Sequence, residues 1–231
     1  MIDNFLFVGL PYITLLLFVG GSIYRAFTGA KSAFRGVEAT ARGDFYWTTR
    51  STGFFGRASI GPAALCLHWG ILTLGVAHII GFIGGALSLA DWVDVFRWVG
   101  MASGVMVLYG AIWALVRRLS VPQVRAMSTN EDFIVLLFII AIAGLGLYHS
   151  AIRLAWGVSY GAGTWIAGIL KLQPDASTMA GAPLTMKLHV VTALLFFAYF
   201  PFTKLVHAFS YPFSYFNRPY ISMRRYVALK R

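Results

Sequence analysis

Five long apolar stretches constrain the fold of this chain more than any other feature of its sequence. Each is close to the roughly 20 residues that an α-helix needs to cross the hydrocarbon core of a bilayer. They cover about residues 5–24, 60–87, 99–116, 133–152 and 184–210. Hydrophobic residues make up 58% of the 231 residues and charged residues only 12%, which excludes an ordinary soluble domain. The sequence therefore predicts an all-α integral membrane protein in which residues 1–231 form a single bundle of five transmembrane helices.

The basic residues predict how this bundle lies in the membrane. The net charge is +11, yet the lysines and arginines lie in the connections between apolar stretches, which does not favour nucleic-acid binding. Fifteen of the 19 lie in the first and third connections or from Lys204 onward. Because cytoplasmic loops carry the excess of Lys and Arg, we expect an outer N-terminus and a basic cytoplasmic tail over residues 211–231. This tail could dock a soluble partner or lie on anionic lipid head groups.

Four of the five histidines lie inside apolar stretches, where a lipid-facing helix would carry no ionisable group. His68 and His78 lie ten residues apart in the second stretch, and His189 and His207 lie eighteen residues apart in the fifth. On an α-helix the first pair is about 80° apart in direction and about 15 Å apart in depth, whereas the second pair shares one face about 27 Å apart. Ionisable side chains in a bilayer usually face the protein interior and a defined partner. Because neutral imidazole is a ligand of haem iron, we expect a bundle that holds two bis-histidine b-type haems.

The expected orientation assigns a partner to each of these histidines. The second helix runs outward and the fifth runs inward, so His78 should face His189 near the outer surface, and His68 should face His207 near the cytoplasm. The separation between His68 and His78 differs from that between His189 and His207 by more than straight parallel helices allow. Tilt of the helices and a kink at Pro201 must therefore absorb the difference. The alternative for each histidine is a hydrogen-bonded residue beside a water-filled cavity.

Glycines, the fifth histidine and the single cysteine add weaker indications. Glycines in the second and third stretches could let a flat macrocycle approach the backbone, or could allow close packing between helices. They are Gly70, Gly75, Gly81, Gly100 and Gly104. His149 lies at the outer end of the fourth stretch without an obvious partner, and we interpret it as interfacial, with contact to a quinone or a proton path as the alternative. Cys66 is the only cysteine, which excludes an internal disulfide and a cysteine-ligated cluster within this chain.

Several local sequences are similar to those of one known family. They are the spacings of the two histidine pairs, ASGV at Ala102–Val105, the RRL…P-x-VRA stretch at Arg117–Ala126, and LHVVTALLFFAYFPFTKLVH at Leu188–His207. Together they resemble the gamma subunit of membrane-bound respiratory nitrate reductase over nearly the whole chain. The resemblance implies a multi-pass protein of the cell (inner) membrane, a di-haem cytochrome b that oxidises quinol, such as menaquinol, near the outer haem.

The same resemblance implies roles for individual residues and for partner proteins. His78 and His189 would ligate the outer haem iron, and His68 and His207 would ligate the inner haem iron. Electrons would pass inward through both haems to an iron–sulfur subunit and then to a molybdenum catalytic subunit, while protons leave on the outer side. The chain would thus be the quinol-oxidising electron-transfer subunit of a respiratory oxidoreductase complex in membrane lipid.

One segment departs from the family pattern. Members of the family use a lysine shortly after the second span to bind quinol, whereas the corresponding segment here is DWVDVFRWVG, with Asp94 near the matching position and Arg97 as the nearest cation. Asp94 and Arg97 are therefore candidates for the quinol site. Arg97 would either hydrogen-bond a quinol oxygen or anchor its helix at the interface. The catalytic subunit of such a member could also act on something other than nitrate.

Two other functions stay open at this point. One is a cytochrome b anchor of a complex that resembles heterodisulfide reductase or is associated with sulfite reduction, in which electrons could flow in the opposite direction. The other is a non-redox transporter or channel that uses its histidines as a proton relay and would be colourless. Hydrolytic chemistry is not expected, because the sequence has no GxSxG, HExxH or phosphate-binding-loop motif.

Overall fold

The computed structural model describes residues 2–34, 57–157, 162–206 and 208, and every regular element among them is helical. The elements are α1 (Ile2–Asn4), the π-helical turn η1 (Phe5–Gly9), α2 (Leu10–Phe34), α3 (Arg57–Ala86), α4 (Ala90–Ser120), α5 (Pro122–Ala126), α6 (Asn130–Trp156), α7 (Gly163–Leu170), the 3-10 turn η2 (Ala176–Met179), α8 (Leu184–Tyr199), and the 3-10 turns η3 (Phe200–Phe202) and η4 (Lys204–Val206). The segments long and apolar enough to span a membrane are Ile2–Arg25, Ile60–Ala86, Asp91–Ser120, Asn130–Trp156 and Leu184–Phe202. The predicted all-α fold with five membrane-spanning helices is confirmed, and the side that each terminus faces stays a prediction.

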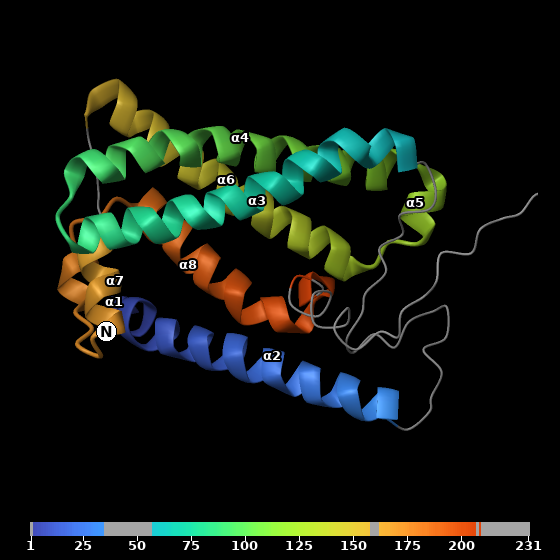
Figure 1. The fold of residues 1–231 in the computed structure, drawn as a ribbon, viewed down its shortest axis with the longest axis horizontal. Helices are drawn as coiled ribbons and strands as arrows, with labels where there is room; N and C mark the ends of the chain where they lie inside the picture. Colours follow the sequence, from blue (N-terminus) through green and yellow to red (C-terminus); the bar gives the residue numbers. More distant parts are fainter. Residues whose placement is uncertain (1, 35–56, 158–161, 207, 209–231) are drawn as a thin grey trace, which may run out of the picture.

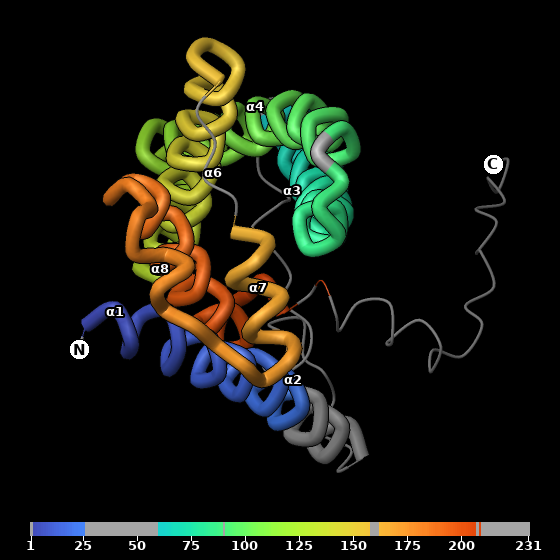
Figure 2. The backbone as a smooth tube through the Cα atoms, turned by 90° about the vertical axis from the view of Figure 1, so that its left-hand side faces the viewer, coloured from blue at the N-terminus to red at the C-terminus, as the bar shows by residue number. Residues whose placement is uncertain are grey.

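The long helices form a curved row rather than a closed ring. α3 packs against α4, α4 against α6, α6 against α8, and α8 against α2. Viewed along the bundle, the row runs from α3 over α4 and α6 to α8 and α2, and α7 lies between its two ends (Figure 2). The histidine-bearing helices α3 and α8 are not among the closely packed pairs of the described residues (Figure 1).

Close backbone approach holds α3 against α4. A Cβ atom at Gly110 would lie 2.6 Å from the carbonyl oxygen of Ala63, and a Cβ atom at Gly70 would lie 2.9 Å from Cγ2 of Val107. Only glycine fits at such distances without moving the backbone. A buried apolar cluster then joins α4 to α6. Its members are Val107, Ala111, Val135, Leu136, Ile139 and Ala143.

The glycines that the sequence suggested for haem approach fall into two groups. Gly70 packs helices together, and added Cβ atoms at Gly100 and Gly104 would likewise meet side chains of neighbouring helices. Cβ atoms at Gly75 and Gly81 would meet no other atom within 4 Å. Of these five glycines, Gly75 and Gly81 therefore remain compatible with the close approach of a macrocycle.

α4 extends well beyond the span expected for it. The sequence predicts a span that begins near residue 99, whereas α4 starts at Ala90 and includes Asp91 and Asp94 in its first turns. Acidic side chains are favoured there, because the helix dipole leaves partial positive charge at the N-terminus. The early start places Asp94 on a helix instead of in a loop.

α8 ends close to Pro201. The sequence predicts one span over residues 184–210 with a kink at this proline, but the α-helix stops at Tyr199 and two 3-10 turns come after it. Proline has no N–H to donate and its ring clashes with the preceding turn, so an α-helix rarely passes it undisturbed. The α-helical part of this span is therefore shorter than expected. His207 and the basic tail 211–231 lie outside the described residues.

An acidic pair at the start of α6 anchors the segment that comes after α8. The Asp132 side chain is only 8% exposed, and its Oδ2 lies 2.8 Å from Nζ of Lys204. Its Oδ1 lies 3.5 Å from Nη2 of Arg118, and its Oδ2 accepts the backbone N–H of Thr129 at 2.9 Å. Glu131 Oε1 accepts the backbone N–H of Lys204. Two carboxylates of α6 thus hold the chain just after the end of α8.

The connection between α6 and α8 contains a helix that the sequence did not predict. α7 packs against α3 where two glycines meet, because a Cβ atom at Gly163 would lie 2.9 Å from the backbone carbonyl carbon of Gly85. On its other side, Nε1 of Trp165 donates to the carbonyl oxygen of Phe7 at 2.8 Å. The buried cluster around this bond comprises Phe7, Trp165, Ala176, Met179 and Val190. α7 therefore joins the end of α3 to the N-terminal segment and to the start of α8.

A local cap starts η2 in the same connection. The Ser177 hydroxyl donates to Asp175 Oδ2 at 2.6 Å, and the backbone N–H of Ser177 donates to Oδ1 at 2.8 Å. These hydrogen bonds hold the pKa of the Asp175 carboxyl below its ordinary value of 3.8. The charged form of Asp175 is thus the form that the folded turn favours.

Candidate functional site

One end of the bundle gathers most of the candidate residues. It is the end where α3 and α6 stop and α4 and α8 begin, here called the His78 end. His78 lies eight residues before the end of α3, and His189 lies five residues after the start of α8. His68 lies ten residues nearer the opposite end, which is about 15 Å along α3.

Backbone carbonyls orient the two histidine rings of α3. Nδ1 of His68 lies 2.7 Å from the carbonyl oxygen of Ala64, and Nδ1 of His78 lies 2.8 Å from that of Leu74, one turn earlier in each case. A carbonyl oxygen can only accept a hydrogen bond, so we assign the ring proton to Nδ1. In a neutral imidazole the lone pair is then on Nε2, which is the arrangement of histidines that ligate metals through Nε2.

His189 has the same arrangement, with the carbonyl supplied by a different helix. Its Nδ1 lies 3.1 Å from the carbonyl oxygen of Ile142 in α6. Gly146, four residues further along α6, leaves space for the ring, because a Cβ atom there would lie 3.1 Å from Cε1 of His189. α6 therefore sets both the position and the tautomer of His189.

The described histidines fit the binding of haem between α3 and α8. A bis-histidine haem takes one imidazole from each of two helices, and the macrocycle between them keeps those helices from packing directly on each other. Over the residues that the structure describes, α3 and α8 are not a closely packed pair. Gly75 lies on α3 within about 60° of both His68 and His78, and its surroundings are open. Over the described ranges there is no group of three or more His, Cys, Asp or Glu that could hold a bare metal ion.

His149 also belongs to the His78 end. It lies on α6, its ring packs edge-on against that of Tyr148 at a centroid distance of 5.5 Å, and its Nε2 atom is buried without a hydrogen-bond partner among the described residues. His149 lies three residues after Gly146, the residue of α6 that leaves space for the His189 ring. Three histidines from three helices therefore lie at this end of the bundle, two of which the sequence had paired and one of which it had left without an obvious partner.

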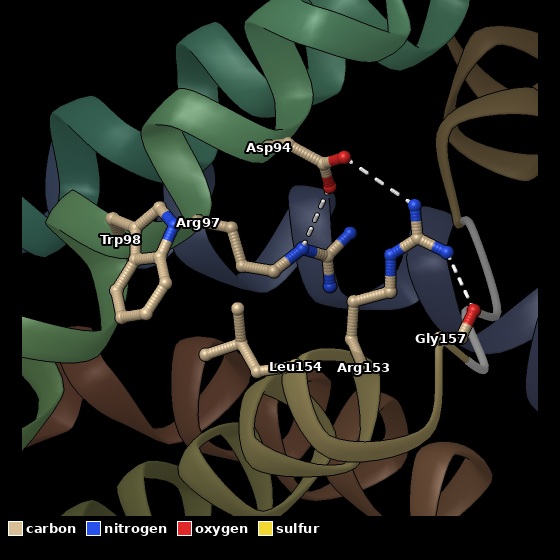
Figure 3. Close-up of a pocket in the computed structure, with 6 residues that line it drawn as sticks. All are labelled: Asp94, Arg97, Trp98, Arg153, Leu154 and Gly157. Carbon is tan, nitrogen blue, oxygen red and sulfur yellow. Dashed lines mark hydrogen bonds and ion pairs between the residues drawn. The ribbon is translucent and has the colours of Figure 1, made fainter.

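A pocket of about 330 Å³ lies at the same end, between α4 and the end of α6. Its lining residues are Asp94, Arg97, Trp98, Arg153, Leu154 and Gly157 (Figure 3). The Asp94 carboxylate bridges two guanidinium groups, with Nε of Arg97 and Nη2 of Arg153 each at 3.3 Å. Arg153 also donates through Nη1 to the carbonyl oxygen of Gly157 at 2.6 Å. The pocket thus offers a carboxylate acceptor and guanidinium donors beside the apolar faces of Trp98 and Leu154.

Two of the residues predicted from the sequence meet in this pocket. Asp94 and Arg97, the two candidates for a quinol site, contact each other and line it together. Arg153, which sequence reasoning counted only among the four basic residues expected on the outer side, is the third charged group of that pocket. Arg153 shares one face of α6 with Gly146 and His149. The sequence could not relate this face to the pocket, because it does not show that α6 packs beside both α4 and α8. The expected partner of His68, His207, lies outside the described residues.

Comparisons with known proteins show which family of proteins this chain is similar to. The family model described as nitrate reductase gamma subunit matches residues 3–226. The chain is 28% identical over 226 residues to the nitrate reductase gamma chain of Bacillus subtilis, which covers 94% of this chain and 95% of that one. It is 29% identical over 192 residues to the respiratory nitrate reductase 1 gamma chain of Escherichia coli, covering 79% of this chain and 85% of the other. It is also 31% identical over 236 residues to the nitrate reductase-like protein NarX of Mycobacterium tuberculosis, covering 97% of this chain and 34% of that protein.

Proposed function

Because this chain belongs to the nitrate reductase gamma subunit family, we propose that it carries electrons from membrane quinol to the other subunits of a nitrate reductase-type complex. Two b-type haems would be its electron carriers, the outer one held by His78 and His189 and the inner one by His68 and His207. The observation that supports this most directly is the common state of the three described rings. Each directs Nδ1 at a carbonyl oxygen and so has its lone pair on Nε2.

The residues of this chain would bind and orient rather than react. A haem iron held by two of these histidines would supply one-electron transfer when bound. The carbonyl oxygens of Ala64, Leu74 and Ile142 hold the imidazole rings in place and increase their basicity, as outer partners of metal-ligating histidines do. Gly75 and Gly146 leave the space that flat rings need against the helices.

Quinol would bind in the pocket of Asp94 and Arg97. A quinol hydroxyl can donate to the Asp94 carboxylate, and a guanidinium group can donate to a ring oxygen, so the pocket supplies both kinds of partner. Trp98 and Leu154 supply an apolar wall for the ring. Oxidation of quinol releases two electrons and two protons, and Asp94 would accept a hydrogen bond from the hydroxyl that loses its proton.

The proposed partners are inferred from the chemistry of a di-haem bundle and from the names of the relatives. A di-haem bundle has no terminal acceptor of its own, so an iron–sulfur subunit and a molybdenum subunit would take the electrons further. The relatives are named as chains of nitrate reductases, which supports this assembly. The tail over residues 211–231 would dock the soluble subunits or lie on anionic lipid.

A redox-difference spectrum of the purified complex tests this function. We expect the absorbance of about two b-type haems per chain, reduced on addition of a menaquinol analogue. A colourless protein would instead support a non-redox relay. Replacing His78 or His189 by Leu should remove the outer haem and spare the inner one, because either change removes one of the two protein ligands of the outer iron only. His68→Leu is the matched control and should remove the inner haem only, so equal loss of both haems in all three variants would contradict the pairing.

A further inference from the structure

His149 has a buried polar atom that the proposed haem ligation does not use. Its Nε2 is shielded from solvent and has no partner among the described residues. A polar group in this state loses the hydrogen bonds that it makes with water in the unfolded chain, so an apolar side chain of similar size would suit a purely structural role better. Ionisable residues within membrane spans are rare and are kept mostly for function.

The position of His149 on α6 relates it to two parts of the site. Gly146, three residues before it, is the residue against which the His189 ring packs, and Arg153, four residues after it, lines the pocket. At 100° per residue these three positions lie within about 60° of one another, and at about 1.5 Å per residue they span roughly one and a half to two turns. His149 therefore lies on the face of α6 that runs from the candidate haem ligand to the candidate quinol pocket.

We propose that His149 binds a ring oxygen of the quinol through Nε2, so that the bound ring lies between the Asp94–Arg153 pair and His189. This inference rests on the proposed function. It selects quinone contact, which the sequence left as an alternative for His149, and extends the site beyond the six residues that line the pocket. A neutral imidazole can present Nε2 either as an acceptor for a quinol hydroxyl or, in the other tautomer, as a donor to a quinone carbonyl. One side chain can therefore hold the substrate before oxidation and the product after it. Asp94 and the arginines would hold the oxygen on the opposite side of the ring, since a pocket fixes a ligand by a few convergent polar groups.

The test compares His149→Leu with His149→Gln in the intact haem-loaded complex. The substrate is a menaquinol analogue with a short tail, and the readouts are KM, kcat, haem content and the midpoint temperature of unfolding. We expect His149→Leu to raise KM about tenfold, which corresponds to about 1.4 kcal/mol. Haem content should stay at the wild-type value, and the midpoint temperature should be unchanged or higher, because an unsatisfied buried nitrogen has been removed. His149→Gln keeps a hydrogen-bonding group and should restore most of the affinity.

Tyr148→Phe is the matched control, because it changes the neighbouring position while keeping the aromatic ring that packs against His149. It should leave KM unchanged. A His149→Leu complex with wild-type KM would overturn the inference, and so would loss of the outer haem in that variant, which would make His149 part of haem binding. A wild-type complex without haem, or without quinol-driven haem reduction, would refute the proposed function itself, so the two failures are distinguishable.

Discussion

Asp132→Asn removes the negative charge at the centre of the contacts between α4, α6 and the segment after α8. The variant keeps the shape of the side chain and can still accept the backbone N–H of Thr129, so the helix cap survives in part. It removes the carboxylate charge that lies 2.8 Å from the Lys204 ammonium and 3.5 Å from the Arg118 guanidinium. The expected effect is therefore mainly electrostatic.

The magnitude depends on the burial of the three groups. Removing one partner of a buried ion pair costs about 3–5 kcal/mol, because the remaining charge stays buried without compensation. The Asp132 side chain is 8% exposed, but those of Arg118 and Lys204 are 17% and 27% exposed, so water compensates part of the loss. We therefore expect the free energy of unfolding to fall by about 2–3 kcal/mol.

The assay is denaturant unfolding of the haem-loaded subunit in detergent micelles, monitored by helical circular dichroism. Asp3→Asn is the control, because the Asp3–Lys187 pair at 3.7 Å has an Asp3 side chain that is 53% exposed. Exposed pairs contribute about 0–1 kcal/mol. If Asp132→Asn lowers the free energy of unfolding no more than Asp3→Asn does, the reasoning from burial is refuted.

Two further predictions concern packing and protonation. Gly110→Ala should lower the free energy of unfolding by about 1–3 kcal/mol in the same assay, because the added Cβ would meet the Ala63 carbonyl oxygen at 2.6 Å. A variant as stable as the wild type would show that α3 can shift freely. Ser177→Ala should raise the pKa of Asp175 toward 3.8, measured by carboxyl NMR, because it removes the hydroxyl that stabilises the charged form. Because the pKa of Asp175 is lower in the folded state, the hydrogen bond stabilises the fold at pH values above the unfolded-state pKa, and this stabilisation is lost as the pH falls through the folded-state pKa. The free energy of unfolding of the variant should therefore fall less at acid pH than that of the wild type. An unchanged pKa of Asp175 in the variant would contradict the role of the hydroxyl.

The membrane-spanning helices could be predicted because length and hydropathy alone determine whether a helix can cross a bilayer. Their ends could not be read in the same way. Asp91 and Asp94 look like a polar turn in the sequence, but the helix dipole makes acidic residues favourable in a first turn, so α4 starts before them. α7 was missed because GTWIAGIL is too short to span and lies in a connection rich in glycine.

The residues of the candidate site also fall into those that the sequence pointed to and those that only the packing of the helices brought out. His68, His78 and His189 could be identified because an ionisable group in an apolar stretch stands out against its neighbours. His149 and Arg153 lie near the end of a span, where a polar residue stands out less from its neighbours in the sequence. Their proposed roles depend on the packing of α6 beside α4 and α8, and this tertiary contact has no local signal in the sequence.

The two sides that would enclose the haems differ in their stiffness. Between His68 and His78 the backbone is one continuous α-helix, so the distance along α3 between these two histidines is fixed. The opposite side is not one continuous helix, because the α-helical part of α8 stops at Tyr199. Beyond that point two carboxylates of α6 hold the chain by hydrogen bonds to Lys204. Any adjustment of the spacing between the two proposed haems would therefore have to be made where the α-helix ends, at Tyr199.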